Sequence, residues 1–257
     1  MRKYFSSILI IFTTMAAASA AVILIRRHYF TTETIEKFPS FQHVSNLNPN
    51  GPQTYNDSVL PDHIQLAIPF TPQAPTANWD ELHNEGCEEA SAIMAAFYFS
   101  PPETEKNNEA ALDPKIVESE ISKLTDWQQQ TFGYHLSINT EETSRMVEEV
   151  YGLETEIIKN FTADDIKKAL AKGKLVLLPA NGRLLKNPYY KQPGPIYHML
   201  VIRGYNSAGF ITNDPGTKRG KNYFYSYETL NSASGNWSRQ ANAVDQSQKQ
   251  ILLVWKQ

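Results

Sequence analysis

The first apolar run of the chain, residues 4–25, contains 22 residues without a formal charge, and two basic residues flank it on each side. A helix of this length, at a rise of ~1.5 Å per residue, would reach ~33 Å. That is enough to cross the ~30 Å hydrocarbon core of a bilayer. The pattern therefore predicts that residues 1–30 form an N-terminal membrane anchor, or else a signal segment.

A cleaved signal peptide is the competing interpretation of this run. The sequence Ala18-Ser19-Ala20 has the small-x-small form that a signal peptidase accepts, and cleavage after Ala20 would leave a secreted protein. However, the apolar run continues to Ile25 and stops at Arg26-Arg27, as expected for a helix that ends at an interface. This favours a single-pass, membrane-anchored protein, and we expect its catalytic domain to be extracytoplasmic, although the positive-inside rule is nearly balanced here.

Residues 31–61 are polar, include Asn-Pro-Asn-Gly-Pro at 48–52 and show little sustained periodicity, which is typical of a tether. A domain over residues 62–257 follows. It begins with an alternating pattern at 64–68 that predicts a short strand, and a proline-rich loop comes after it. Capping residues and apolar periodicity then predict helices over 87–99, from 114 to about 130, from about 140 to Gly152, and over 163–172.

The later part of the domain changes to short apolar runs separated by turn signals such as Asn206-Ser207-Ala208-Gly209. Strands are predicted at residues 175–179, 198–204, 210–213, 222–225 and 251–255. Helices that come first and strands that come later indicate an α+β fold.

Composition narrows the class of function. With 41% hydrophobic and 20% charged residues, the chain has the composition of an ordinary globular protein with one substantial core. All 27 acidic residues but only 20 of the 24 basic ones lie from position 28 onward, and the resulting charge near −7 argues against a nucleic-acid partner. A single cysteine, Cys87, permits neither an intramolecular disulfide nor an all-cysteine zinc site.

Cys87 lies at the predicted start of the helix over 87–99, directly after Gly86. At this position unpaired backbone N–H groups and the positive end of the helix dipole favour thiolate over thiol. We therefore expect the pKa of this thiol to be lowered. The alternative is that Cys87 is simply a small core residue.

A cysteine nucleophile needs a base, and His198 is the preferred candidate. It begins a predicted strand, which would hold its side chain rigidly at a sheet end. Asp214 ends the next predicted strand, and a carboxylate there could fix the tautomer of the imidazole, although Asp-Pro-Gly is also a turn signature. The other histidines lie in the tether, in polar loops or in weakly predicted segments: His28, His43, His63, His83 and His135.

Four segments together carry a resemblance to a known family: Pro72-Gln73-Ala74-Pro75 with Trp79, the helix start Gly86-Cys87-Glu88-Glu89-Ala90-Ser91, the strand His198–Tyr205, and Asn213-Asp214-Pro215-Gly216. In this order they look like cysteine peptidase family thirty-nine, the double-glycine-leader peptidases and their stand-alone relatives.

The resemblance covers about residues 62–257. It implies a papain-like fold, a catalytic triad of Cys87, His198 and Asp214, and a Gln73 amide that donates to the oxyanion together with the backbone N–H of Cys87. The sequence departs from the family at Glu88, where many relatives have glycine. No ATPase or six-helix membrane domain follows in the sequence, which places a role in bacteriocin export in doubt.

The expected function is thiol-dependent cleavage of amide bonds through a thioester, with a peptide or protein substrate and no cofactor or metal. Two alternatives stay open. A transglutaminase-like acyltransferase or amidase would use the same triad and resolve the thioester with an amine. A non-catalytic peptide-binding module would keep the groove of a papain-like fold without the activity.

Overall fold

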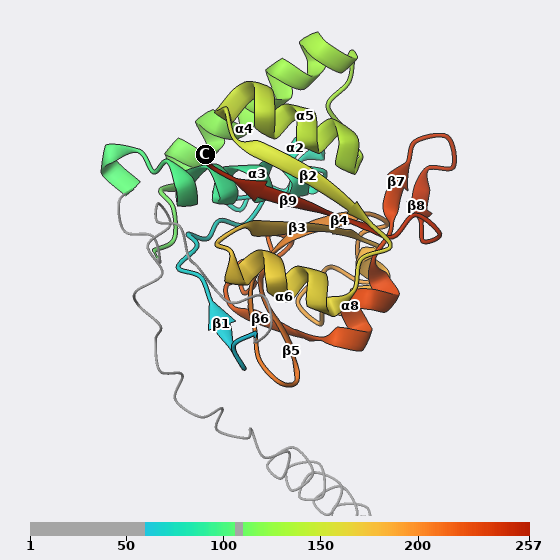
Figure 1. Cartoon of the computed structure of the whole chain (residues 1–257). Coiled ribbons are helices and arrows are strands. Elements are labelled where there is room, and N and C mark those ends of the chain that lie inside the picture. Colours follow the sequence, from blue (N-terminus) through green and yellow to red (C-terminus); the bar gives the residue numbers. More distant parts are fainter. Residues whose placement is uncertain (1–59, 106–109) are drawn as a thin grey trace, which may run out of the picture. The chain divides into compact units, whose positions relative to one another are not determined.

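The computed structural model describes residues 60–105 and 110–257 (Figure 1). The predicted anchor over residues 1–30 and nearly all of the predicted tether lie outside these residues. Within the described ranges, no helix is both long enough and apolar enough to cross a membrane.

The helices begin and end at residues that physical chemistry favours for caps. In α4 (Pro114–Phe132), Asp113 accepts a hydrogen bond from the Lys115 backbone at 2.8 Å, and Gly133 closes the helix in the left-handed conformation. Capping boxes begin α5 (Thr140–Tyr151) and α6 (Ala163–Ala171). The other helices are α2 (Glu81–Asn84), α3 (Cys87–Phe99), the 3₁₀ turn η1 (Glu103–Glu105), α7 (Gly182–Leu185) and α8 (Tyr227–Ala233).

The strands form one large antiparallel sheet and one small hairpin. In the described part of the chain the large sheet has seven strands, in the order β2-β9-β3-β4-β5-β6, with β1 also paired to β4. Its strands are β1 (Ile64–Gln65), β2 (Glu154–Lys159), β3 (Leu175–Ala180), β4 (His198–Tyr205), β5 (Gly209–Asn213), β6 (Tyr223–Ser226) and β9 (Gln250–Trp255). The hairpin consists of β7 (Asn236–Ser238) and β8 (Ala243–Asp245).

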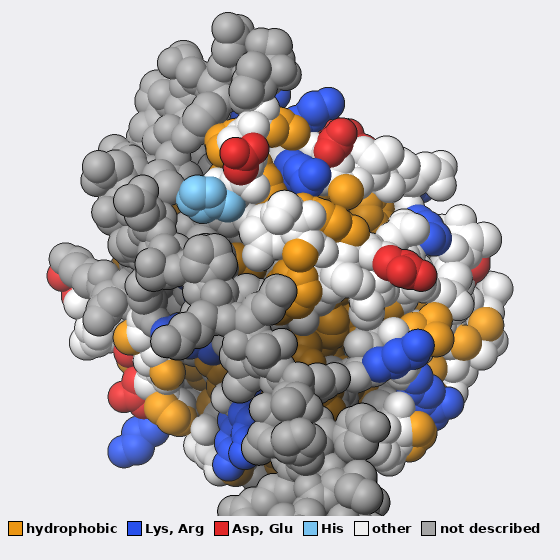
Figure 2. All heavy atoms as spheres, turned by 90° about the horizontal axis from the view of Figure 1, so that it is seen from below, with side chains coloured by type: hydrophobic (Ala, Val, Ile, Leu, Met, Phe, Trp, Pro, Cys, Tyr) orange, Lys and Arg blue, Asp and Glu red, His pale blue; other side chains and the backbone are white. Residues whose placement is uncertain are grey.

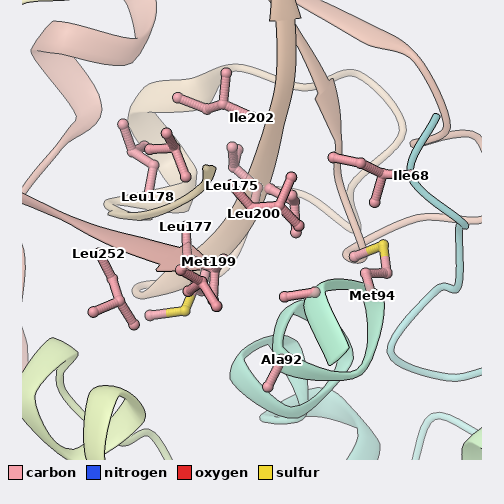
Figure 3. Close-up of a cluster of buried hydrophobic side chains, with 14 of the residues drawn as sticks. Ile68, Ala92, Met94, Leu175, Leu177, Leu178, Met199, Leu200, Ile202 and Leu252 are labelled. Carbon is pink, nitrogen blue, oxygen red and sulfur yellow. The ribbon is translucent and has the colours of Figure 1, made fainter. Parts of the chain in front are cut away.

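Helices cover the sheet on two sides. The group α3, α4 and α5 lies on one side of the strands β2, β9 and β3, while α6 and α8 lie on the other (Figure 1). Every residue of α3 is buried, the helix contacts β4, and Ala92 and Met94 belong to the same buried hydrophobic cluster as Met199 and Leu200 (Figure 3). Burying a methionine side chain such as that of Met94 stabilises the fold by ~1.5–3 kcal/mol. The helix that carries Cys87 is therefore fixed firmly against the sheet.

A β-bulge interrupts the pairing of β4 with β5. Val201 lies opposite Asn213 and Gly204 lies opposite Ile211, so β4 spans one residue more than β5 between the same two pairs. The extra residue is Arg203, which is 1% exposed and donates from Nε to the Leu66 carbonyl at 2.9 Å. A buried guanidinium bonded to a distant loop therefore accompanies the shift in register.

The face of the domain seen from below carries side chains of several kinds. Figure 2 shows hydrophobic, basic and acidic side chains interspersed over the coloured part of the face seen from below. Within the described residues, four large hydrophobic side chains are exposed: Trp79, Leu184, Tyr189 and Ile196.

The α+β prediction is confirmed, and each helix and strand predicted for the domain lies within a few residues of an observed one. Differences occur at elements with weak patterns: β1 is only two residues long, and α2, η1, β2, α7, α8, β7 and β8 are additional. The sheet is antiparallel throughout. The narrower expectation of a papain-like arrangement stays a prediction.

Candidate active site

Cys87 is the first residue of α3, with Gly86 as the N-cap and no side chain capping the helix. The helix contacts β4, and the Ser91 hydroxyl donates to the Met199 carbonyl at 3.3 Å. Because Met199 follows His198 in the chain, this hydrogen bond holds the first turns of α3 beside the start of the histidine strand. The structure therefore brings the elements that carry Cys87 and His198 together.

The thiol itself is 3% exposed, and its sulfur donates to Glu88 Oε2 at 2.8 Å. Burial raises the pKa of the Cys87 thiol well above its ordinary value, and the negative charge of Glu88 adds to the rise, while the Met199 backbone amide opposes it. The expectation of a lowered thiol pKa is wrong for this arrangement. The helix dipole is outweighed by desolvation and by a carboxyl group that the dipole argument left out.

His198 and Asp214 form a direct pair. Both side chains are almost completely buried, and His198 Nε2 lies 2.8 Å from Asp214 Oδ1. Within the described residues, no hydrogen bond joins His198 to Cys87.

Five donors surround the Asp214 carboxylate. Oδ1 accepts from His198 Nε2 and from the Gly216 backbone at 3.0 Å. Oδ2 accepts from the hydroxyls of Tyr190 and Tyr225, each at 2.6 Å, and from the Asn187 amide at 3.0 Å. Burial alone would raise the pKa of this carboxyl, but the charge of His198 and these hydrogen bonds outweigh it and lower the pKa.

An ionised Asp214 decides which nitrogen of His198 carries a proton. A carboxylate only accepts, so Nε2 of His198 must be the protonated nitrogen in this pair. In the neutral imidazole, Nδ1 then has a free lone pair and can act as a base. The Tyr190 ring lies edge-on to the imidazole of His198, with ring centroids 5.4 Å apart, and this contact further restricts the orientation of the imidazole.

Gln73 lies between the nucleophile helix and the Asp214 turn. Its backbone N–H donates to the Pro215 carbonyl at 2.9 Å, and a Cβ placed on Gly86 would lie 3.8 Å from the Cβ of Gln73. Its amide nitrogen donates to the carbonyls of His83 and Asn84, at 2.8 and 3.0 Å, while its buried Oε1 has no partner among the described residues. Gln73 thus has a structural role that the sequence did not suggest.

We expect Gln73→Ala to lower the free energy of unfolding by ~1–3 kcal/mol, because it leaves the buried His83 carbonyl without this donor. Urea denaturation measures the change. Asn78→Ala is the matched control, since Asn78 lies in the same loop and its amide bonds only to the exposed Asp80 carboxylate in the described structure. Equal stability of the two variants would contradict the structural role.

His83 is fixed by two carboxylates rather than lying loosely in a polar loop. Its Nδ1 lies 2.7 Å from Asp80 Oδ1, and its Nε2 lies 2.8 Å from Glu118 Oε2 on α4. Burial by itself would lower the pKa of His83, but the hydrogen bonds to Asp80 and Glu118 outweigh it and raise the pKa above its ordinary value of 6.5. The imidazolium therefore connects the loop that contains Gln73 to α4.

This pair of contacts predicts a dependence of stability on pH. Because the folded-state pKa of His83 is raised, its contribution is complete below the unfolded value of about 6.5 and is lost as the pH rises through the folded value. Unfolding free energies measured from pH 6 to 9 should therefore fall more steeply for the wild type than for His83→Gln. Parallel curves would contradict this prediction.

Several residues of the site could not be identified from the sequence. Tyr190 and Asn187 lie in the irregular segment after α7, and Tyr225 lies in β6, so their convergence on Asp214 depends entirely on tertiary structure. His135 is in a loop and has a buried Nδ1 without a partner among the described residues. The described residues contain no group of three or more His, Cys, Asp or Glu that could hold a metal ion.

A cysteine at a helix N-terminus, beside a strand whose histidine is bonded to a buried carboxylate, is the set of groups used by enzymes with a thiol nucleophile. The sequence agrees with this class: residues 65–244 match the model of the Peptidase_C39 like family, and the chain belongs to that family. Membership supports peptidase activity.

Among solved structures, the chain is similar to one from Bacillus anthracis that is described as a C39-like peptidase. The two are 13% identical, with a TM-score of 0.49 over 77% of this chain and 99% of the other. It is also similar to UfSP from C. elegans, with 13% identity and a TM-score of 0.40 over 79% of this chain and 35% of the other. None of the curated proteins with which the sequence was compared matches it.

Proposed function

We propose that this protein is a cysteine peptidase that cleaves amide bonds with Cys87 as the nucleophile, His198 as the base and Asp214 as the orienting group. The observation that carries the proposal is the His198–Asp214 pair: a carboxylate with five donors holds Nε2 protonated and leaves Nδ1 as the basic nitrogen. Family membership and the contact between α3 and β4 support the same assignment.

In the first half of the proposed reaction, His198 Nδ1 takes the thiol proton and the sulfur attacks the carbonyl carbon of the scissile amide. The tetrahedral intermediate collapses when the C–N bond breaks. The imidazolium then gives its proton to the leaving amine, and a thioester remains on Cys87. In the second half, Nδ1 takes a proton from water, the hydroxide attacks the thioester, and the acid product leaves as the proton returns to sulfur.

The negative charge of the tetrahedral intermediate needs donors. We assign these to the backbone N–H of Cys87 at the helix N-terminus and to the Gln73 amide. Because both N–H groups of Gln73 are bonded to the carbonyls of His83 and Asn84, one of them must be released to the oxyanion when substrate binds. Gln73 would then donate to the substrate only in the reacting complex.

Digestion of a peptide library with the full chain, followed by mass spectrometry of the products, tests the proposal. We expect each cleaved peptide to give two fragments whose combined mass equals that of the intact peptide plus one water. Products that carry an added amine instead would indicate the transglutaminase-like acyltransferase. Peptides that bind but stay intact would indicate the peptide-binding module.

We further propose that the apolar N-terminal run holds the domain at a membrane surface, on the extracytoplasmic side, and contributes nothing to the chemistry. This is supported by its 22 uncharged residues and by the polar segment that follows it. Deleting residues 1–30 is expected to yield soluble protein with the same kcat/KM on a small peptide. A loss of kcat/KM would contradict the proposal, as would a mature N-terminus at Ala21 in protein purified from its own cells.

A further inference from the structure

Glu88 accepts a hydrogen bond from the thiol of the nucleophile. It is the second residue of α3 and is 1% exposed, and its two carboxyl oxygens have different partners. Oε2 lies 2.8 Å from the sulfur of Cys87, and Oε1 accepts from the Ile138 backbone at 2.8 Å. The Ile138 N–H fixes the carboxyl group through its other oxygen, so the contact with sulfur is held in place by the loop before α5.

The surroundings of Glu88 offer no compensating positive charge within the described residues, since no Lys or Arg forms an ion pair with it there. The titratable groups that act on this contact are acids and a phenol, and His198 lies at the start of β4, which packs against α3. Glu89 is also buried on α3, Glu85 faces Glu89, and Tyr197 lies near both Glu88 and Cys87. Burial and the charge of Glu89 raise the pKa of Glu88 well above its ordinary value. A thiolate and a carboxylate 2.8 Å apart would repel each other strongly, so at least one proton stays between them.

The hydrogen bond from Cys87 to Glu88 replaces the contact with His198 that a reactive cysteine needs. For attack, the sulfur must give its proton to His198, yet in the described structure its side-chain hydrogen bond goes to Glu88. The thiol donates to this carboxyl, so the sulfur keeps its proton while the contact lasts, and a negative charge on one of the two groups opposes a second charge on the other. The nucleophile is thus held in its unreactive form by the residue that follows it.

We propose that Glu88 is a positioning residue that restrains Cys87 as a thiol in the resting protein, and that this contact must break before Cys87 can pair with His198. The effect on the thiol is independent of what the protein cleaves. Only its catalytic consequence rests on the proposed peptidase function.

The variant Glu88→Gln removes the charge of the Glu88 side chain and keeps its shape. Its side-chain oxygen can still accept from the Ile138 N–H, and its amide N–H can donate to sulfur and so stabilise the thiolate. Glu89→Gln is the matched control. Glu89 is adjacent, equally buried and bonded through Oε1 to Gln128, but it makes no hydrogen bond to Cys87 within the described structure. Glu88→Met is a second uncharged variant, and it keeps the test valid if the amide introduced in Glu88→Gln disturbs folding.

The measurement is the titration of Cys87 followed by NMR in the full chain labelled with ¹³C-cysteine. Cys87 is the only cysteine, so one signal reports its ionisation. We expect the pH midpoint of the Cys87 titration to fall by about one pH unit or more in Glu88→Gln. At any pH below both midpoints, this variant would then contain about tenfold more thiolate than the wild type. Glu88→Met should shift it in the same direction, and Glu89→Gln should shift it by less than about a third as much.

An unchanged midpoint in both Glu88 variants, or an equal shift in Glu89→Gln, would overturn the proposal. Peptide cleavage supplies an independent readout: the rise of kcat/KM with pH, which reports the free enzyme, should move to lower pH in Glu88→Gln by the same amount as the thiol midpoint. If the titration shifts while the wild type cleaves no peptide, the restraint by Glu88 stands and the peptidase function fails.

Discussion

Replacing Cys87 with alanine is expected to lower the rate of peptide cleavage by ~10⁴-fold or more, because no thioester can form without the sulfur. The rate should be measured as kcat/KM on a peptide that the library digestion identifies. Alanine is smaller than cysteine, and the position is buried and mainly apolar, so the fold should be retained. A melting curve verifies this.

Asp214→Asn is the comparison that tests the assigned roles. The variant keeps an oxygen that can accept from His198, so it disturbs orientation without removing the nucleophile, and its activity should exceed that of Cys87→Ala. A Cys87→Ala protein that retains the wild-type rate would exclude the thiol mechanism altogether.

The second large effect is expected from Gly216→Ala, with a loss of ~10²-fold in kcat/KM, the order that follows from a misplacement of ~1 Å in a catalytic group. A Cβ at this position would lie 2.9 Å from Cε1 of His198 and 2.8 Å from Cε1 of Tyr190. Both rings are rigid and are bonded to Asp214, so neither can move without disturbing the pair. One of the two rings or the turn that carries Gly216 must therefore shift, and each of these moves disturbs the His198–Asp214 pair.

Lys218→Ala is the matched control for this prediction, because Lys218 lies in the same turn with an exposed side chain. It should cleave peptides at the wild-type rate. If Gly216→Ala were as active as Lys218→Ala, with an unchanged melting temperature, the precise placement of His198 would not matter for the reaction.

The local elements of the domain could be predicted because their signals are local. Asp113 followed by Pro114, the Asn139–Glu142 capping box and the glycines at 133 and 152 specify helix ends through contacts within a few residues. The strands β3, β4 and β9 are buried runs bounded by turn residues. In contrast, β2 alternates only partly and contains three charged residues, so it forms a strand because it pairs with β9.

The amino-acid sequence by itself determined that Cys87 begins a buried helix, that His198 begins a strand, and that Asp214 follows the next strand. The sequence did not determine whether the side chains of His198 and Asp214 lie close together. Continuing the observed register of β4 and β5 places position 214 opposite Leu200, on the same face as His198. Without the bulge, position 214 would lie opposite Val201 and face the other side of the sheet.

Tertiary structure therefore decided the site. The bulge is held by the buried guanidinium of Arg203, which donates to the Leu66 carbonyl from a position 137 residues away in the chain. The donors to Asp214 come from separate segments, and the carboxyl that restrains Cys87 is fixed by a loop 50 residues further on. Each of these contacts depends on groups that are far apart in sequence and become neighbours only after the helices and strands have packed, so no local pattern records them.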